Sequence, residues 1–466
     1  MSPTRVLILG GGYVGLYSAL TLRKKARADV DITLLDRRGY MTYQSFLPEA
    51  SAASLEPRHV VVPLRRELHG VHVVQATATA IDHASRTVRA TTDYGEDLTL
   101  EYDEIVIALG AIPRTLPIPG LAEMGMGFKW IEEAIQLRNT VLGRIARAAT
   151  THDPAVRRRL LTFVFVGAGF AGIEAFGETE DMARAALRYY PELSPSDLRF
   201  VMVEAASRIL PEMSEEMGVY TLGVLRKRGM EIYLDTRLES CVGGRIRLSD
   251  GQEFDADTLV WTAGVKPNPL LADSDLPTGP KGHVNVAATL QVADLDGAVI
   301  PGAWAAGDNA QVPDLARGDG AWCGPTAQHA VRQARLLGRN LAAHIDGRPL
   351  SAYRHKNLGT VASLGLFEGV AQVMGVKLRG WPAWFMHRTY HMAKIPTFNR
   401  KARVILDWTA ALFFRRDLVS LGRLHEPRQA FLEAVSGDEP ASVPESASAA
   451  RARKSRNSGF DKHSHN

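Results

Sequence analysis

The chain has 466 residues, of which 45% are hydrophobic and 23% charged, as in a soluble globular protein of two or three domains. Its two cysteines, Cys241 and Cys323, lie far apart, which argues against a disulfide framework, excludes electron relay through neighbouring thiols and suggests a reducing compartment. Residues 371–466 hold 16 Lys or Arg and 8 Asp or Glu, a net charge of +8, so an anionic partner is expected there.

The first unit reads as strand, glycine-rich turn, helix and strand. A strand at residues 5–9 starts too early to leave room for a signal peptide. It runs into a turn with Gly10, Gly12 and Gly15, and a helical pattern follows. The next strand, residues 32–35, ends at Asp36, which lies 21 residues beyond Gly15, near the roughly 20-residue spacing of a ribose-binding carboxylate.

Each residue of this turn has a distinct expected role in binding a dinucleotide. Gly10 permits the tight turn, Gly12 lets the backbone approach a pyrophosphate, and Gly15 lets the helix pack on the strand. The helix N-terminus offers free N–H groups to the phosphates, and Asp36 accepts hydrogen bonds from the ribose. A surface loop with an exposed acid is the structural alternative.

Short alternating strands are expected between residues 71 and 100, with a turn at Asp93-Tyr94-Gly95. An apolar strand at residues 105–109 then closes at Gly110.

A second unit of the same kind begins at residue 161. Its strand, residues 163–166, enters a turn with Gly167, Gly169 and Gly172, and the following strand, residues 200–203, ends at Glu204. The acid is 32 residues beyond Gly172, and an insertion around residues 189–195 accounts for the excess. A carboxylate here favours a free 2′-hydroxyl and repels a 2′-phosphate, so NADH is favoured over NADPH, although Arg208 would blunt that preference.

Glu174, two residues past Gly172, allows two interpretations. As an acid in the first turn of the helix it would complement the helix dipole. As a functional group it would lie near the nicotinamide and the flavin and relay protons.

The remaining strands and helices complete two doubly wound units. Residues 260–264 resemble the last strand of the second unit, and a strand near residue 304 leads to Gly307 and Asp308, followed by a helix over residues 325–344. The fold class is therefore α/β, with two Rossmann-like dinucleotide-binding domains and a C-terminal amphipathic helical region. We expect an FAD domain in two parts (1–125 and 269–375), an NADH domain (126–268), a membrane-associating region (376–435) and a disordered tail (436–466).

Residues 381–416 interleave aromatic side chains with Arg and Lys. The longest apolar run, residues 404–414, has 11 residues, too few for the ~30 Å hydrocarbon core. The pattern predicts a helix lying in the interface and attracted by anionic lipid. Packing of the aromatic groups on the body or in a homodimer contact is the alternative. No fold signal for nucleic-acid binding accompanies them, so no nucleic-acid partner is expected. No metal site is expected either.

The order of motifs resembles that of the type II NADH dehydrogenases, single-chain enzymes that reduce a membrane quinone without pumping protons. The resemblance spans about residues 5–421 and rests on both glycine turns with the segments 102–110, 167–174, 261–264, 306–308 and 325–328. Two departures are notable. Arg332 occupies the position at which the family's Ala-Gln-x-Ala-x-Gln motif has its second glutamine, and Gln333 follows it. Residues 41–57 also differ from the sequence that is usual in the family.

The resemblance implies the site as follows. Asp308 would hold the ribityl-phosphate side of FAD, residues 45–48 would line the isoalloxazine, and Gln328 would contact the quinone. The expected catalytic residues are Glu174 and Gln328, and the expected cofactor-binding residues are Gly10, Gly12, Tyr13, Gly15, Asp36, Arg37, Ser45, Gly110, Gly167, Gly169, Gly172, Glu204, Gly264, Gly307, Asp308 and Ala327.

The sequence thus predicts a peripheral enzyme on the cytoplasmic side of the cell membrane, with non-covalent FAD, that passes a hydride from NADH to the flavin and two electrons to a quinone. Two alternatives stay open: a reductase of the same architecture with a soluble acceptor, and an NADH-binding flavoprotein that acts as a redox sensor with little turnover.

Overall fold

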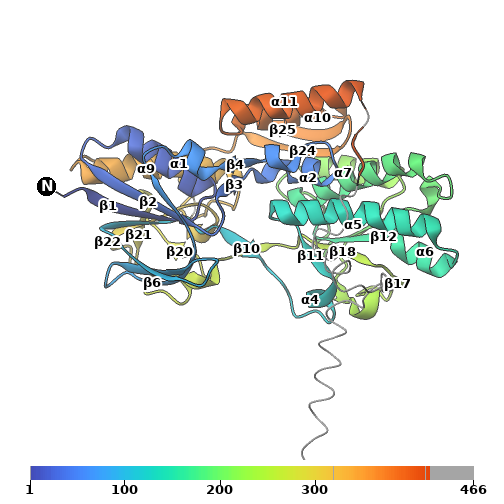
Figure 1. Cartoon of the computed structure of the whole chain (residues 1–466), viewed down its shortest axis with the longest axis horizontal. Helices are drawn as coiled ribbons and strands as arrows, with labels where there is room; N and C mark the ends of the chain where they lie inside the picture. Colours follow the sequence, from blue (N-terminus) through green and yellow to red (C-terminus); the bar gives the residue numbers. More distant parts are fainter. Residues whose placement is uncertain (1, 319, 415, 420–466) are drawn as a thin grey trace, which may run out of the picture.

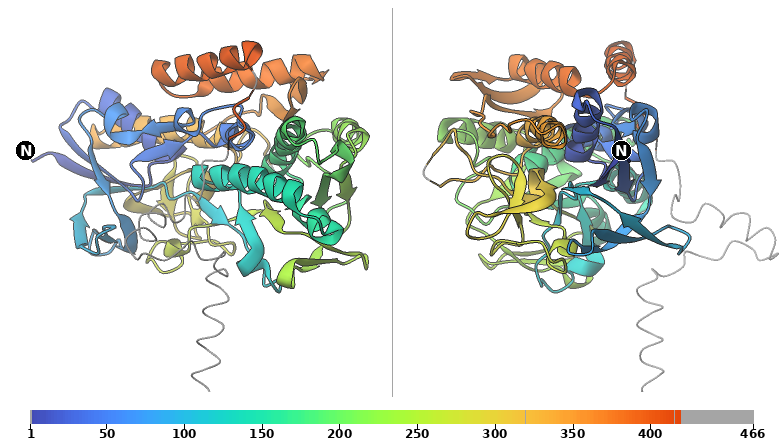
Figure 2. Two further views of the ribbon diagram at one scale, coloured as in Figure 1. Left: turned by 45° about the vertical axis from the view of Figure 1, so that its right-hand side comes forward. Right: turned by 90° about the vertical axis from the view of Figure 1, so that its left-hand side faces the viewer.

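The computed structural model describes residues 2–318, 320–414 and 416–419. Two α/β lobes stand side by side, and the last two described helices lie along one face above both lobes (Figures 1 and 2). The predicted tail at 436–466 and the end of the predicted membrane-associating region lie outside the described residues.

The first lobe is built on a six-stranded sheet with the order β21-β22-β9-β1-β2-β5. Strands β1, β2, β9 and β22 run parallel, and β21 is the antiparallel edge. The strands are β1 (Thr4–Leu9), β2 (Val30–Asp36), β5 (His72–Gln75), β9 (Glu104–Ile107), β21 (Gln291–Ala293) and β22 (Val299–Ala305). Two segments about 190 residues apart therefore share one sheet, as the predicted two-part FAD domain requires.

Helices α1 (Tyr13–Lys25) and α9 (Ala327–Ile345) pack against each other in this lobe. A Cβ on Gly338 of α9 would lie 2.7 Å from the Ser18 carbonyl oxygen, so this close packing requires glycine. Smaller elements surround the sheet: β3 (Tyr40–Thr42), β4 (Val61–Pro63), α2 (Leu47–Ser51), α3 (Leu64–Glu67), β6 (Thr77–Asp82), β7 (Thr87–Thr91), β8 (Asp97–Glu101), β20 (Val284–Asn285) and β23 (Ala310–Gln311).

The second lobe has a five-stranded parallel sheet with the order β11-β18-β12-β13-β14. Its strands are β11 (Gly125–Gly127), β12 (Thr162–Val166), β13 (Arg199–Val203), β14 (Glu231–Tyr233) and β18 (Thr258–Trp261). Its helices are α4 (Leu121–Met124), α5 (Ile131–Thr150), α6 (Pro154–Leu160), α7 (Phe170–Ala186) and α8 (Glu215–Lys227). A small antiparallel sheet follows, formed by β15 (Leu238–Ser240), β16 (Arg245–Leu248) and β17 (Glu253–Asp255).

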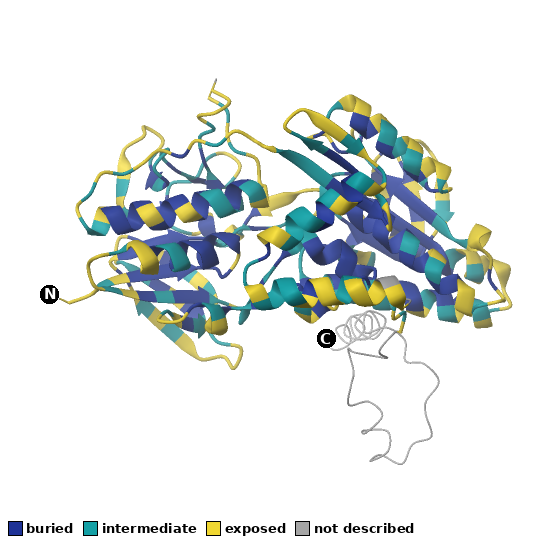
Figure 3. Ribbon diagram, turned by 90° about the horizontal axis from the view of Figure 1, so that it is seen from above, coloured by how far each residue is buried: buried dark blue, intermediate teal, exposed yellow. Residues whose placement is uncertain are grey.

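An antiparallel ribbon, β10 (Ala111–Pro113) with β19 (Val265–Pro267), joins the two lobes. The central strands of both sheets are buried on both faces, as the continuous apolar runs in the sequence indicate (Figure 3). The predicted fold class of two Rossmann-like units is confirmed. Two predicted strands are shorter than expected, because β9 ends at Ile107 and β18 at Trp261, where each chain turns into a loop.

The C-terminal part begins with a three-stranded antiparallel sheet, β24 (Gly359–Gly365), β25 (Glu368–Val373) and β26 (Val376–Arg379). Helices α10 (Trp381–Lys394) and α11 (Phe398–Phe413) follow. In the predicted membrane-associating region, residues 376–435, β26 pairs with β25 and the helical part begins at Trp381. Within the described residues, no helix has the length and apolar character needed to span a bilayer.

Candidate functional site

The first glycine turn has the predicted geometry. Gly10 has a φ of +105°, and a Cβ on it would lie 2.4 Å from the Ala108 carbonyl oxygen. A Cβ on Gly15 would lie 1.8 Å from the Gly10 carbonyl oxygen, so only glycine lets α1 start so close to β1. By contrast, no atom lies within 4 Å of a Cβ on Gly12. The backbone at Gly12 therefore faces open space, as close approach of a pyrophosphate requires.

Asp36, at the end of β2, holds this turn from the side. Its carboxylate accepts hydrogen bonds from the backbone N–H groups of Gly11 and Arg38, each at 2.6 Å. Burial raises the pKa of this carboxyl group, and the two backbone hydrogen bonds oppose that rise. The acid therefore shapes the turn as well as facing the cavity beside it.

A cavity of about 470 Å³ opens in front of the first turn. Among the predicted cofactor-binding residues, its walls include Gly10, Gly12, Tyr13, Asp36, Arg37, Gly110, Asp308 and Ala327. Sequence reasoning missed the Trp130 ring, which lies under the guanidinium groups of Arg38 and Arg37 at 4.2 and 5.1 Å. It also missed Lys129, whose Nζ lies 3.8 Å from the Asp308 carboxylate.

Gly307 supports this cavity from outside its walls. Its φ of +74° and its N–H hydrogen bond to Gln333 Oε1, 2.8 Å long, set the turn that carries Asp308. Asn309 Oδ1 likewise accepts a hydrogen bond from the Gly110 N–H at 2.9 Å. The buried Gln333 is thus a positioning residue of the first lobe.

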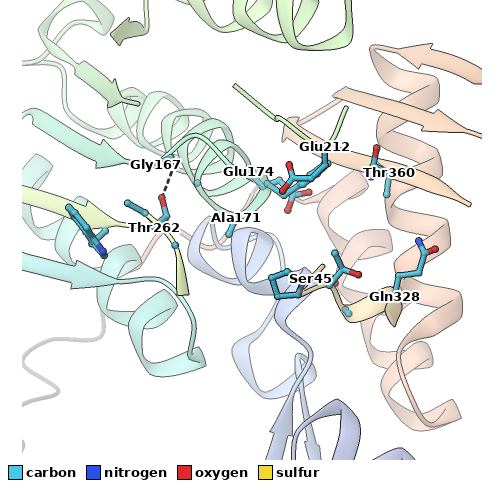
Figure 4. Close-up of a pocket in the computed structure, with 18 of the residues that line it drawn as sticks. Ser45, Gly167, Ala171, Glu174, Glu212, Thr262, Gln328 and Thr360 are labelled. Atoms are coloured by element: carbon cyan, nitrogen blue, oxygen red, sulfur yellow. Dashed lines mark hydrogen bonds between the residues drawn. The ribbon is translucent and has the colours of Figure 1, made fainter. Parts of the chain in front are cut away.

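The second turn repeats the first. Gly167 has a φ of +104°, a Cβ on Gly172 would lie 1.9 Å from the Gly167 carbonyl oxygen, and the space before Gly169 is open. Glu204 accepts hydrogen bonds from the N–H groups of Ala168 at 2.5 Å and Ala206 at 2.8 Å. The Thr262 hydroxyl, just after β18, donates to the Gly167 carbonyl oxygen at 2.8 Å and fixes the turn (Figure 4).

The expected influence of Arg208 on the coenzyme site is not seen in the structure. Its Nη2 group donates to the carbonyl oxygens of Pro211 and Met213, and the residue is not part of the wall of the second cavity. The insertion before Glu204 extends α7 and adds short 3₁₀ turns at Leu187–Tyr189 and Pro195–Asp197, so β13 still ends at Val203.

A second, larger cavity of about 950 Å³ runs between the lobes. Its walls include Gly167, Gly169, Gly172, Glu204 and Gly264 of the second lobe, and Tyr17, Gln328, Arg332, Tyr390 and His391 of helices α1, α9 and α10. Gly167 and Gln328 lie at opposite ends of this cavity (Figure 4). Tyr13, Pro325 and Ala327 line both cavities, so the two cavities share a wall.

Ser45 and Gln328 face this second cavity on one side, and Glu174 on α7 lies on another (Figure 4). Of residues 45–48, only Ser45 lines the cavity. Phe46 and the first residues of α2 are buried in the core of the protein, and their contact with an isoalloxazine stays a prediction.

Glu174 does not complement the α7 dipole. The helix starts at Phe170 and has no acid in its first turn, which leaves Glu174 as its fifth residue. The carboxyl group is buried, accepts a hydrogen bond from the Ser363 N–H at 3.1 Å, and lies 2.9 Å from Nε2 of His387.

Burial sets the charge of this pair. It raises the pKa of Glu174 to about 8 and lowers that of His387 to about 4, so both groups are uncharged at neutral pH. Two further buried acids, Glu49 and Glu178, surround His387, and burial raises the pKa of Glu49 well above its usual value. A protonated carboxyl group therefore lies at the cavity wall at neutral pH, which suits a proton donor.

Gln328 lies at the N-terminal end of α9, where its side-chain amide is largely occupied. Its Oε1 atom accepts hydrogen bonds from His355 Nε2 at 2.8 Å and from the Leu358 N–H at 3.2 Å. Its Nε2 atom donates to the Gly359 carbonyl oxygen at 3.3 Å, which leaves one N–H of the amide for a ligand.

The chain is similar in sequence to known nicotinamide-dependent oxidoreductases. Residues 4–334 match the family of pyridine nucleotide-disulphide oxidoreductases. The type II NADH:quinone oxidoreductase Ndh of Mycobacterium tuberculosis is 28% identical over 424 residues, which cover 88% of this chain and 89% of that protein. The type II NADH:quinone oxidoreductase of Staphylococcus haemolyticus is 29% identical over 395 residues, 82% of this chain and 93% of that protein.

Among solved structures, NDH2 from Plasmodium falciparum in complex with NADH superposes with a TM-score of 0.82 at 15% identity, covering 90% of this chain and all of that one. The sulfide:quinone oxidoreductase of Aquifex aeolicus superposes with a TM-score of 0.66 at 14% identity, covering 89% of this chain and 96% of that one. The resemblance that the motifs predict is confirmed by these relatives.

Proposed function

Because the chain belongs to the pyridine nucleotide-disulphide oxidoreductase family, we propose that it is an FAD-dependent NADH:quinone oxidoreductase that does not pump protons. The balanced reaction is NADH + quinone + H⁺ → NAD⁺ + hydroquinone. FAD, when bound, accepts a hydride from NADH and supplies two electrons to the quinone.

One observation carries this proposal: the two cavities share a wall at Tyr13, Pro325 and Ala327. A cofactor held in the smaller cavity along the first turn would meet the larger cavity at that wall. The larger cavity contains both the second glycine turn and the Gln328 end, so it has room for a nicotinamide donor and an acceptor near the same wall.

The first cavity fits FAD by its donors and its shape. The open backbone at Gly12 suits the pyrophosphate, Asp36 suits the adenosine ribose, and the Trp130 wall with its two arginines suits an adenine ring. Asp308 with Lys129 lies where the ribityl-phosphate side would be held. We assign residues 1–125 and 269–375 to this domain.

The second turn is assigned to NADH, with Gly169 facing the pyrophosphate and Glu204 facing the ribose. We assign residues 126–268 to this domain. In the larger cavity, Glu174 would donate a proton to the quinone oxygen as its charge develops, with the uncharged His387 2.9 Å from its carboxyl group.

Two half-reactions test the proposal. Mixing the purified protein with NADH should bleach the flavin absorbance, and a short-chain quinone should then restore it. Bleaching without reoxidation by the quinone would contradict the proposal and favour a soluble acceptor. No bleaching at all would favour the redox sensor.

We further propose that α11 attaches the protein to an anionic lipid surface on the cytoplasmic side of the cell membrane. Val404, Asp407 and Trp408 face the body of the protein. The opposite face exposes an apolar row at helical spacing, Phe398, Ile405, Leu406 and Phe413, with exposed fractions of 85%, 44%, 65% and 79%. The basic residues Lys394, Arg400, Lys401 and Arg403 lie at the start of α11 or just before it.

The outward row can be removed without disturbing the inward face. The triple variant F398S/L406S/F413S should lose sedimentation with vesicles that contain phosphatidylglycerol, because each large apolar side chain contributes about 1.5 kcal/mol or more when buried. Its turnover with a soluble quinone should stay unchanged. Val219→Ser, which removes an equally exposed apolar side chain on α8, is the matched control. Retained vesicle binding, with a smaller particle size in lipid-free buffer, would show instead that the row forms a homodimer contact.

A further inference from the structure

Three cations line the end of the larger cavity that lies away from the second glycine turn. Arg332 and Arg335 are three residues apart on α9, so their side chains share one side of that helix, and Lys394 is the last residue of α10. Tyr17 links the two helices: the Arg335 guanidinium lies 5.0 Å from its ring, and its hydroxyl donates to the Lys394 carbonyl oxygen at 3.4 Å.

These charges have no acidic counterpart at that end of the cavity. Within the described residues, no carboxylate lies within ion-pair distance of Arg332, Arg335 or Lys394. Of the three acids in the cavity wall, Glu204 binds the second turn, Glu174 is buried and uncharged at neutral pH, and Glu212 is exposed on the loop between β13 and α8. In the part of the chain that the structure describes, the Arg332 guanidinium donates only to the Gln328 carbonyl oxygen, at 2.9 Å.

The imidazoles near Arg332 are held uncharged, so they add no positive charge to that of the three cations. Burial, and after it the charge of Arg332, lowers the pKa of His355, and burial likewise lowers the pKa of His329. Neither pyrophosphate site accounts for the three cations, because the first cavity does not include them and the second turn lies at the other end of its cavity.

We propose that this end of the cavity binds an acceptor that carries a negative charge at neutral pH, a quinone with an ionised hydroxyl or carboxylate group, through Arg332, Arg335 and Lys394. The inference rests on the proposed function, since it specifies the acceptor class of the same site. Arg332 supplies the most sheltered charge and a planar pair of donors, and the exposed Arg335 and Lys394 add a weaker attraction at the mouth.

The test compares two naphthoquinones of similar size with the FAD-loaded enzyme in detergent-free, lipid-free buffer: 2-hydroxy-1,4-naphthoquinone, ionised at pH 7, and the neutral 2-methyl-1,4-naphthoquinone. Arg332→Gln should lower the ratio of kcat/KM for the anion to kcat/KM for the neutral quinone by about 10-fold, the effect of losing a sheltered charged hydrogen bond. Arg335→Gln and Lys394→Gln should each lower it about two- to threefold. Arg339→Gln, an exposed change one turn further along α9 outside the cavity, should leave the ratio unchanged.

A second measurement needs no turnover. Equilibrium dialysis of the ionised naphthoquinone against oxidised holoenzyme should show tighter binding to the native chain than to Arg332→Gln, with a difference that shrinks at high salt. An unchanged ratio in all three variants, an equal loss for both quinones, or a loss confined to vesicle binding would overturn the proposal. If the native enzyme turns over neither quinone yet dialysis shows the charge-dependent binding, the proposed function fails and the anion site stands.

Discussion

The two glycine turns are alike in geometry and differ in what encloses them. In each, the first glycine has a φ near +105°, and the third would place a Cβ within 2 Å of the carbonyl oxygen of the first. In each, the acid at the end of the next strand accepts a backbone N–H from the turn and another from two residues beyond itself. The shared backbone geometry explains why both sequences have the same pattern of glycine.

The surroundings of the two turns fit the two ligands proposed for them, a resident cofactor and a substrate that must exchange. The first turn faces a cavity of about 470 Å³ whose wall includes Trp130 and Lys129. The second turn faces the cavity of about 950 Å³ whose wall also includes Gln328 and Arg332. The two helices also differ at the position two residues after the third glycine. The first unit has Tyr17 there, and the second has Glu174, whose carboxyl group is protonated at neutral pH.

The largest effect is expected from filling the third glycine of each turn. Gly15→Val should yield protein without FAD, because its Cβ meets backbone that cannot shift. Gly172→Val should keep FAD but weaken NADH binding by at least about 100-fold. Flavin content after gel filtration and NADH titration measure the two outcomes. Gly143→Ala on α5, where a Cβ meets nothing within 4 Å, is the control. Loss of FAD in the Gly172 variant would contradict the assignment of FAD to the first turn and NADH to the second.

Glu174→Gln should slow reoxidation by quinone about 100-fold, the usual scale of a lost proton donor, and leave flavin reduction by NADH within about twofold. Burial raises the pKa of Glu174 to about 8, so its acid form is present below that pH. The native quinone-reduction rate should therefore fall as the pH rises through about 8, and Glu174→Gln should lack this fall. Tyr17→Phe, at the equivalent position of the first unit, should retain it. A native rate that does not change across this pH range would contradict the role.

Glu204→Ala should reduce the preference for NADH over NADPH about 10-fold, because the carboxylate that repels a 2′-phosphate is lost. The ratio of kcat/KM values for the two coenzymes measures it. Arg208→Ala should leave that ratio unchanged, since its guanidinium is held by backbone carbonyl oxygens. A change in the Arg208 variant would show that this side chain reaches the coenzyme in solution.

The smallest effect is expected at Gln328, where only one N–H remains for a ligand. Gln328→Ala should slow quinone reduction about threefold without changing flavin reduction. His355→Ala removes one of the hydrogen bonds to Gln328 Oε1 and should change the rate of quinone reduction by no more than about threefold. Equal losses in both half-reactions would place Gln328 elsewhere in the mechanism.

Features encoded by neighbouring residues could be predicted from the sequence, and features made by distant contacts could not. The turns and their acids follow from local spacing, as the 21 residues between Gly15 and Asp36 show. The partner of Glu174, His387, is more than 200 residues away, and no pattern around either residue points to the other. The Gln333 contact with Gly307 is similar, because a glutamine on a helix has no preferred partner until the fold is known.

The Arg388 guanidinium lies between the rings of Trp384 on α10 and Trp408 on α11, at 4.2 and 4.9 Å, and Trp408 also packs against Phe46, next to Ser45 in the chain. Cutting the chain before these helices would strip the packing from the wall that holds Ser45. A detergent-free form for inhibitor screening is therefore better obtained by redesigning the outer surface of α11 than by truncation.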